Sequence, residues 1–288
     1  MALRVAVGQF RSLPDKEANL ERMESFARSA ARAGAELLLF PEGAMAPFDD
    51  EAAPRLPEWA EELDGPFARR LAEMARRYGL LLVAGLLERP AGAGDAAGGR
   101  RVYNTAVAWG PDGRRLAAYR KIHLFDALGS LESDRFLAGE EEPPVFDWSP
   151  REGARLRLGL AICYDVRFPE VSRRLAERGA ELLLLPSAWV RGLLKEEQWE
   201  LLVRARALEN TCYVLAADQV GGPYCGRSLL ADPMGLAAAA AGEEEALLLA
   251  DVDPGRVRRV REKLPVLRHR RPELYRRWQA GTAEGTEA

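Results

Sequence analysis

The chain has 288 residues, 48% of them hydrophobic, which is enough for one large globular domain or two small ones that fold without disulfides or structural metal ions. A formal net charge of −3 at pH 7 provides no basic surface for nucleic acid, so we expect no nucleic-acid partner. No apolar run approaches the ~18 residues of a membrane span, and we expect no membrane partner.

Strand and helix patterns alternate in the first half of the chain. Apolar residues alternate at 3–10, as in a strand, and recur at 15–33 with helical spacing. The remaining predicted elements of this half are a buried strand at 36–40, a helix at 67–78, and strands at 80–86, 102–109 and 114–121, the last two joined by a turn at 111–113.

The second half continues this alternation. Its predicted elements are a strand at 156–162, a helix at 169–178, a strand at 181–185, a helix at 199–209, a strand at 212–217 and several short strands that end near Asp251. Such alternation is typical of α/β folds, in which functional loops lie at the carboxyl ends of the strands.

Two segments of the chain are nearly identical. Residues 34–44 read GAELLLFPEGA, and residues 179–189 read GAELLLLPSAW. In each, a helix that ends at glycine leads into a strand buried on both faces, and a proline ends the strand. The repeat indicates two related halves, although a recurrent way of building a buried strand would also produce it. Glu42 and Ser187 both follow these predicted strands.

Two stretches of small residues carry no chemistry. Gly92, Gly94 and Ala97 match a loose dinucleotide-binding pattern, but the segment leads into a strand rather than a helix. We therefore expect a flexible hairpin loop at 92–100. We expect the alanine run at 237–241 to be a weakly specified strand or turn.

Cys163 lies where a continuous apolar strand ends. Pro169 can begin a helix shortly afterwards, so the thiol would be held at an elbow whose backbone N–H groups can stabilise an oxyanion. This setting favours a nucleophile, but a lone cysteine at a strand end is more often a small core residue. We interpret Cys212, within a strand pattern, and Cys225, in a turn-rich loop, as structural, with a position lining a pocket as the alternative for Cys225.

The cysteines also bear on the cellular compartment. There are three of them and no CxxC pair, which is typical of a reducing environment. The first ten residues lack the charged-then-apolar layout of a secretion signal. We therefore expect the protein in the cytoplasm.

A thiol with its ordinary pKa of ~8.5 needs a base or a cation nearby to react at neutral pH. The chain has only two histidines, so carboxylates and lysines are the candidates. Glu42 follows a buried strand in an apolar segment, which would raise its pKa and suit a general base. Lys121 is one of four lysines among 41 basic residues, and apolar residues follow it. The alternatives are a strand-end cap for Glu42 and an ordinary surface cation for Lys121.

Three motifs, in this order and spacing, resemble those of the nitrilase, or carbon–nitrogen hydrolase, superfamily. They are FPEGAMAPF at 40–48, YRKIHLFD at 119–126 and LAICYDVRFPE at 160–170. The resemblance covers nearly the whole chain, including NTA at 104–106, the stretch at 199–219 and LPVLRHRRPELY at 264–275. It implies that Cys163 is the nucleophile, Glu42 the general base and Lys121 the cation that stabilises the oxyanion.

The resemblance implies further site residues. Glu132, in LESDRF, matches a second glutamate that positions the lysine and the substrate. The substrate-binding residues that it implies are Phe48, Tyr164, Ser187 and Ala188, with no metal and no organic cofactor. Arg167 is a candidate partner either for a carboxylate of the substrate or for Asp165.

The motifs look most similar to the branch that contains omega-amidases and deaminated glutathione amidases. The substrate implied is a small linear ω-amide of the 2-oxoglutaramate or deaminated glutathione type, cleaved through a thioester. One segment departs from this branch, because Lys195 to Trp199 reads KEEQW where the branch has Gly-x-Ala-His-Trp. A nitrilase, an N-carbamoyl hydrolase, a general aliphatic amidase and a noncatalytic regulatory member are the alternatives.

The resemblance also implies the architecture and the assembly. We expect an α/β fold with four layers, α-β-β-α, in which two sheets lie face to face with helices outside. We expect a homodimer or a larger homo-oligomer that associates through the outer helices and the C-terminal arm. Residues 1–278 would form the carbon–nitrogen hydrolase domain, and 279–288 a flexible tail.

Overall fold

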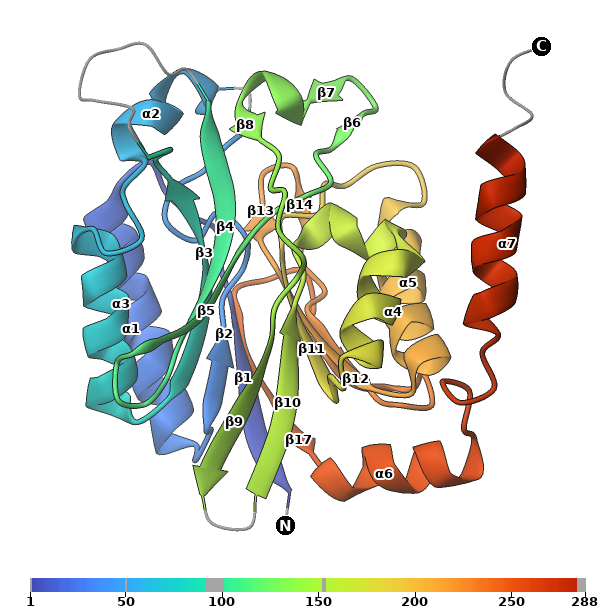
Figure 1. Cartoon of the computed structure of the whole chain (residues 1–288). Helices are drawn as coiled ribbons and strands as arrows, with labels where there is room; N and C mark the ends of the chain where they lie inside the picture. Colours follow the sequence, from blue (N-terminus) through green and yellow to red (C-terminus); the bar gives the residue numbers. More distant parts are fainter. Residues whose placement is uncertain (1, 50, 92–100, 152–153, 284–288) are drawn as a thin grey trace.

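The computed structural model describes residues 2–49, 51–91, 101–151 and 154–283. Two large mixed sheets lie face to face, with α1 and α3 outside the first and α4 and α5 outside the second (Figure 1). The expected four-layer α-β-β-α sandwich is thereby confirmed. No helix among the described residues is both long enough and apolar enough to cross a membrane.

The first sheet has the strand order β17-β1-β2-β3-β4-β5, and β8 pairs with β4. Its strands are β1 (Leu3–Gln9), β2 (Leu37–Leu39), β3 (Leu81–Glu88), β4 (Val102–Trp109), β5 (Arg115–Arg120), β8 (Phe136–Leu137) and β17 (Ala246–Val252). The second sheet has the order β16-β15-β12-β11-β10-β9. Its strands are β9 (Val145–Arg151), β10 (Ala154–Leu160), β11 (Leu182–Ser187), β12 (Tyr213–Asp218), β15 (Leu229–Ala231) and β16 (Ala237–Ala240).

Helices and short elements complete the described chain. The α-helices are α1 (Lys16–Arg32), α2 (Leu56–Trp59), α3 (Pro66–Tyr78), α4 (Pro169–Glu177), α5 (Lys195–Asn210), α6 (Pro254–Lys263) and α7 (Pro272–Ala283). The 3₁₀ turns are η1 (Ala53–Arg55), η2 (Glu132–Asp134) and η3 (Cys163–Arg167). Two small hairpins pair β6 (Asp126–Ala127) with β7 (Ser130–Leu131), and β13 (Val220–Gly221) with β14 (Tyr224–Cys225).

Local signals explain the ends of the main helices. The Asp15 side chain caps α1 by accepting hydrogen bonds from the backbone N–H groups of Glu17 and Ala18 at 2.9 and 3.1 Å. Pro66 begins α3, and Gly79 ends it with φ at +64°, a conformation that glycine adopts without strain. Helix α5 begins at Lys195, one turn before the expected position, because its first turn is polar and lacks the apolar spacing that marks the rest.

The two sheets have the same internal design. Read from β17 and from β9, successive pairs of strands are antiparallel, parallel, parallel, antiparallel and antiparallel. The repeated segments occupy equivalent places: the backbone N–H of Glu36 donates to Arg4, and that of Glu181 donates to Arg157, both at 2.8 Å. The repeat at 34–44 and 179–189 therefore reflects two halves with the same geometry.

The main hydrophobic core lies between the sheets. Leucines and valines of β1 and β2 pack there against apolar residues of β10, β11 and β12. A second core fills the space between the first sheet and its covering helices, with Met23 of α1 and Leu71 of α3 among its buried members. The sandwich thus holds the carboxyl ends of β2, β5, β10 and β11 in fixed relative positions, from which the site is built.

Three remaining expectations concern small-residue and terminal segments. The alanine run does form a strand, β16. The loop expected at 92–100 lies outside the described residues. Helix α7 continues to Ala283 and so reaches into the expected tail, while 284–288 lie outside the described residues, so that a flexible tail there stays a prediction.

Candidate active site

Four side chains predicted from sequence come together at one end of the sandwich. Glu42 follows β2, Lys121 follows β5, Glu132 begins η2, and Cys163 follows β10 as the first residue of η3. All four line one cavity of about 330 Å³. Both sheets contribute to it, as expected for a site at the carboxyl ends of strands.

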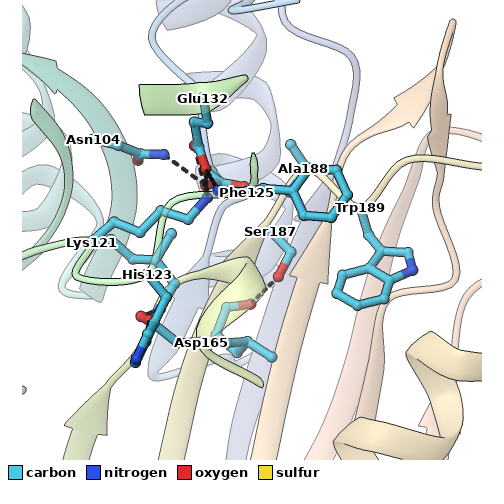
Figure 2. Close-up of polar contacts among 12 residues, drawn as sticks. Asn104, Lys121, His123, Phe125, Glu132, Asp165, Ser187, Ala188 and Trp189 are labelled. Carbon is cyan, nitrogen blue, oxygen red and sulfur yellow. Dashed lines mark hydrogen bonds and ion pairs between the residues drawn. The ribbon is translucent and has the colours of Figure 1, made fainter. Parts of the chain in front are cut away.

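Lys121 lies between the two glutamates. Figure 2 shows its side chain reaching towards Glu132. Its Nζ donates to Glu42 Oε1 at 2.9 Å and to both carboxylate oxygens of Glu132 at 2.8 Å. The lysine is only 2% exposed, and burial lowers its pKa, but Glu132 and Glu42 outweigh burial and raise the pKa well above its ordinary value. Lys121 is therefore a permanent cation in the wall of the cavity.

Glu42 has a hydrogen-bond partner on each carboxylate oxygen. Oε1 accepts a bond of 2.7 Å from the side-chain amide of Asn104, and Oε2 accepts one of 2.8 Å from the backbone N–H of Ala188. Burial raises the pKa of Glu42 and Lys121 opposes this, with a net rise above the ordinary carboxyl value. A carboxylate whose pKa is raised in this way is suited to accept a proton as a general base.

The backbone at Cys163 adopts a rare conformation. Its φ is +43°, in the left-handed region that residues with a Cβ seldom enter. Burial and the neighbouring Glu42 carboxylate raise the pKa of the thiol well above its ordinary value, while Lys121 and the backbone N–H of Ala188 lower it. The resting thiol is therefore protonated, and the nearby Glu42 carboxylate is the group placed to receive its proton.

A buried carboxylate holds this turn in place. Asp165 Oδ2 accepts hydrogen bonds of 2.9 Å from the backbone N–H of Ile162 and from the hydroxyl of Tyr119. Its Oδ1 lies 2.7 Å from His123 Nδ1, and the imidazole stacks on Phe168 with ring centroids 3.6 Å apart. Asp165 thus ties the residues on both sides of Cys163 to β5 and to the loop that follows Lys121.

The cavity includes most of the predicted substrate-binding residues. Phe48, Tyr164 and Ala188 line it, whereas Ser187 does not. Ser187 is fully buried within β11, where it pairs with Asp218 of β12. Its hydroxyl lies 3.5 Å from the carbonyl oxygen of Leu185.

Arg167 is not a partner of Asp165, and its contact with a carboxylate of the substrate stays a prediction. It does not line the cavity, and the partners of Asp165 are the ones described above. Instead, its guanidinium donates a bond of 2.6 Å to Gln198 Oε1 and lies 4.8 Å from the ring centroid of Trp189. The glutamine that departs from the branch pattern thus holds this arginine behind the cavity wall.

The other two cysteines are buried and outside the cavity lining. Cys212 is fully buried in the main hydrophobic core, as expected. Cys225 is also fully buried, and its thiol donates to Asp218 Oδ2 at 3.1 Å. All three cysteines are free thiols. Among the described residues, no group of three or more histidine, cysteine, aspartate or glutamate side chains could hold a metal ion.

Sequence reasoning missed several residues that shape the site. The sequence presents Asn104 only within the NTA motif and Asp165 only as a candidate partner of Arg167. Trp189 and Lys195 of the cavity wall had no assigned role. The local sequence indicates little about these residues, because each acts through contacts with other segments of the chain. For Lys195, the one indication in the sequence is that lysine is rare in this chain.

Comparisons with known proteins agree with this geometry. The chain matches the model of the carbon–nitrogen hydrolase family over residues 4–262. It is 41% identical to a deaminated glutathione amidase of Escherichia coli O157:H7, over 93% of this chain and 97% of that one. It is 35% identical to the human omega-amidase NIT2, over 95% of this chain and 97% of that one.

Solved structures of amidases are also similar to this chain. An amidase from Nesterenkonia sp. superposes with a TM-score of 0.78 and 31% identity, over 96% of both chains. A mutant of that amidase, with a TM-score of 0.78 and 30% identity over 96% of both chains, carries the acetamide moiety of fluoroacetamide covalently added at its active-site cysteine.

Proposed function

The chain belongs to the carbon–nitrogen hydrolase family and is a hydrolase that acts on amides; we propose that it releases ammonia from a small linear ω-amide that carries a carboxylate. The observation that carries the proposal is the buried cluster of Glu42, Lys121 and Glu132 beside the thiol of Cys163 in one cavity. The names of the relatives support the ω-amide substrate. We assign the role of nucleophile in this reaction to Cys163.

The first half-reaction forms a thioester. Glu42 accepts the thiol proton as the Cys163 sulfur attacks the carbonyl carbon, and the carbonyl electron pair moves onto oxygen. The Lys121 ammonium and the backbone N–H of Tyr164 stabilise this oxyanion, and such a donor is typically worth about 2.7–4 kcal/mol. The intermediate collapses as the C–N bond breaks, and Glu42 returns its proton to the leaving nitrogen, which departs as ammonia.

The second half-reaction regenerates the thiol. Glu42, again ionised, takes a proton from a water molecule, whose oxygen attacks the thioester carbonyl. The same donors hold the second oxyanion, which collapses with cleavage of the C–S bond. Glu42 then gives its proton to the sulfur, and the product leaves as a carboxylic acid that loses its proton to solvent. Glu132 takes no proton in this scheme; its role is to hold Lys121 in position.

The experiment is ammonia release from a panel of substrates, with mass spectrometry of the protein under turnover. The panel compares 2-oxoglutaramate and deaminated glutathione with butyramide, an aliphatic nitrile and an N-carbamoyl amino acid. We expect the highest kcat/KM for the carboxylate-bearing amides and an acyl adduct on the peptide that contains Cys163. Equal kcat/KM for butyramide would instead indicate a general aliphatic amidase, and an adduct at another residue would contradict the mechanism.

We also propose a homodimer that works in a reducing compartment, the cytoplasm. Exposed apolar side chains support an interface: on α5, Leu201 and Leu208 are 67% and 46% exposed, and on α7, Trp278 is 63% exposed. Helix α7 stands beside the body of the protein (Figure 1), tied to it by an ion pair between Arg270 and Glu177 of α4. Light scattering of the wild type and Leu201→Glu tests this, with dissociation expected for the variant. The three free thiols support the reducing compartment.

A further inference from the structure

The side chain of Lys195 lies in the wall of the active-site cavity. Lys195 is the first residue of α5, and only 3% of its surface is exposed. Its ammonium lies 4.0 Å from the ring centroid of Trp189 and 4.9 Å from that of Phe125, and all three residues line the cavity. Two aromatic faces thus hold this cation, and cation–π attraction stabilises it.

Lys195 lacks the partner that a buried cation normally has. Within the part of the chain that the structure describes, no carboxylate lies within 4.0 Å of its Nζ, and no oxygen accepts a hydrogen bond from it. Burial and the neighbouring Arg167 lower its pKa. Because a buried charge without a counter-ion costs free energy, a ligand that supplies an anion to this position would be stabilised.

The other charged side chains that line the cavity have partners in the protein. Asp49 accepts a bond of 3.1 Å from the backbone N–H of Ala52, and Arg135 donates to the carbonyl oxygen of Phe48 and the hydroxyl of Ser130 at 3.0 and 3.1 Å. Glu42, Lys121 and Glu132 pair with one another. Arg191, at the exposed rim, donates a bond of 2.7 Å to the carbonyl oxygen of Tyr224. Lys195 is therefore the buried cation of this cavity whose charge remains available to a ligand.

Building on the amidase function proposed above, we propose that Lys195 binds the carboxylate of the substrate and so selects linear amides with an anion at the end opposite the amide. The amide end meets Cys163 and Lys121 while the anionic end meets Lys195, and a cavity of about 330 Å³ suits a substrate of this size. Lys195 occupies the position of the glycine in the Gly-x-Ala-His-Trp segment of the branch. This cation therefore belongs to the segment, 195–199, in which the chain differs from that branch.

A purely structural role is the competing explanation. Lys195 packs on Trp189, and the indole Nε1 of Trp189 donates to the carbonyl oxygen of Lys195 at 2.8 Å. If packing were its only role, loss of the charge would affect every substrate equally. Lys195→Met keeps the length and the apolar stem of the side chain and preserves this backbone bond, so it removes the charge alone.

The test compares two amides of the same length, glutaramate, which ends in a carboxylate, and 5-oxohexanamide, which ends in a neutral ketone. In Lys195→Met we expect kcat/KM for glutaramate to fall roughly 10- to 100-fold, mainly through KM, as for loss of one charge-assisted hydrogen bond. For 5-oxohexanamide it should stay near the wild-type value. Lys195→Arg should restore part of the preference. Arg204→Met, which removes one positive charge from the exposed face of α5 outside the cavity lining, is the matched control and should change the ratio little.

The outcomes separate this inference from the proposed function. An equal loss for both amides in Lys195→Met would leave the amidase function intact and overturn the role of Lys195. If the wild type released no ammonia from either amide, the proposed function would fail. The role of Lys195 would then be tested by glutaramate binding alone. For that, calorimetry measures glutaramate binding to Cys163→Ala and to Cys163→Ala/Lys195→Met. A weaker Kd in the double variant supports carboxylate binding, whereas equal or absent binding overturns it.

Discussion

Glu42 and Ala188 are joined by a hydrogen bond of 2.8 Å, although 146 residues separate them. Glu42 belongs to the repeated segment at 34–44 and Ala188 to its copy at 179–189, so the bond connects the two halves of the fold. The backbone N–H of Ala188 also acts on the Cys163 thiol, whose pKa it lowers. The orientation of the proposed base therefore depends on correct docking of one sheet on the other.

Cys163→Ala should abolish ammonia release with little change in Tm, because the thiol makes the bond to carbon while Ala keeps the Cβ. Cys163→Gly should be equally inactive but more stable than Cys163→Ala by roughly 1 kcal/mol, since glycine relieves the strain of φ +43°. Activity assays and chemical denaturation check both. Cys212→Ala, in the core, is the control: it should lose stability and keep activity. Turnover by Cys163→Ala would refute the assignment of the nucleophile.

In Asn104→Ala, the acid limb of the pH profile of kcat/KM should move to higher pH. Glu42 must be ionised to accept the thiol proton, and its pKa is already raised, so the limb should lie above the ordinary carboxyl value of about 4.3. Asn104 donates to the ionised carboxylate, and loss of this bond should raise the pKa by roughly another unit. Thr105→Val is the control, because its hydroxyl bonds to Glu88, outside the cavity lining. An unshifted limb in Asn104→Ala would contradict this role.

Lys121→Arg should lower kcat/KM by about 100-fold or more, although the charge is kept. The ammonium fits between Glu42 and Glu132 at 2.8–2.9 Å, and a planar guanidinium would displace the carbonyl by about 1 Å, which can cost ~100-fold. Steady-state kinetics are measured beside a thermal melt. Lys16→Arg, at a lysine paired with Glu61 outside the cavity lining, should keep full activity. A Lys121→Arg enzyme with more than about a tenth of wild-type activity would make this lysine an ordinary cation.

Tyr119→Phe should destabilise the fold by about 1.5–3 kcal/mol, the usual worth of a hydrogen bond to a charged group. Its hydroxyl bonds to the fully buried Asp165, which loses a partner that water cannot replace there. Since Asp165 positions the backbone beside Cys163, kcat should fall as well. Tyr78→Phe, whose hydroxyl bonds to Glu24 nearer the surface, should cost less. Urea unfolding compares the two, and equal effects would show that Asp165 needs no support from Tyr119.

Local chemistry explains which features could be predicted from sequence. Gly79 and Pro66 mark the ends of α3, and the leucine run of β2 is a buried strand in any α/β context. Glu42 and Cys163 stood out because each directly follows such a strand. The repeat equates Ser187 with Glu42, but β11 continues through Ser187 by pairing with β12. Ser187 therefore lies outside the cavity lining, and its role in substrate binding stays a prediction.

Long-range contacts explain what could not be predicted. Asp165 holds Tyr119 from 46 residues away, and nothing near either residue in the chain announces this bond. The role of Lys195 depends on the rings of Phe125 and Trp189, one of them far away in the chain, which place its ammonium in the cavity. The contact between Arg167 and Gln198 likewise needs η3 and α5 to be packed together before it can be seen.

The position of β17 bears on the order in which the protein can fold during synthesis. β17 (Ala246–Val252) is the edge strand beside β1, the first strand made, and pairs with it along its whole length from Leu3↔Val252 to Gln9↔Ala246. Its counterpart in the second sheet, β9, directly precedes the strand that it pairs with. The ribosome therefore completes the second half as a continuous unit, while the first half waits with β1 unpaired on one side until nearly the whole chain has emerged. Nascent chains that stop before Ala246 should accordingly depend on chaperones, because β1 remains an open edge.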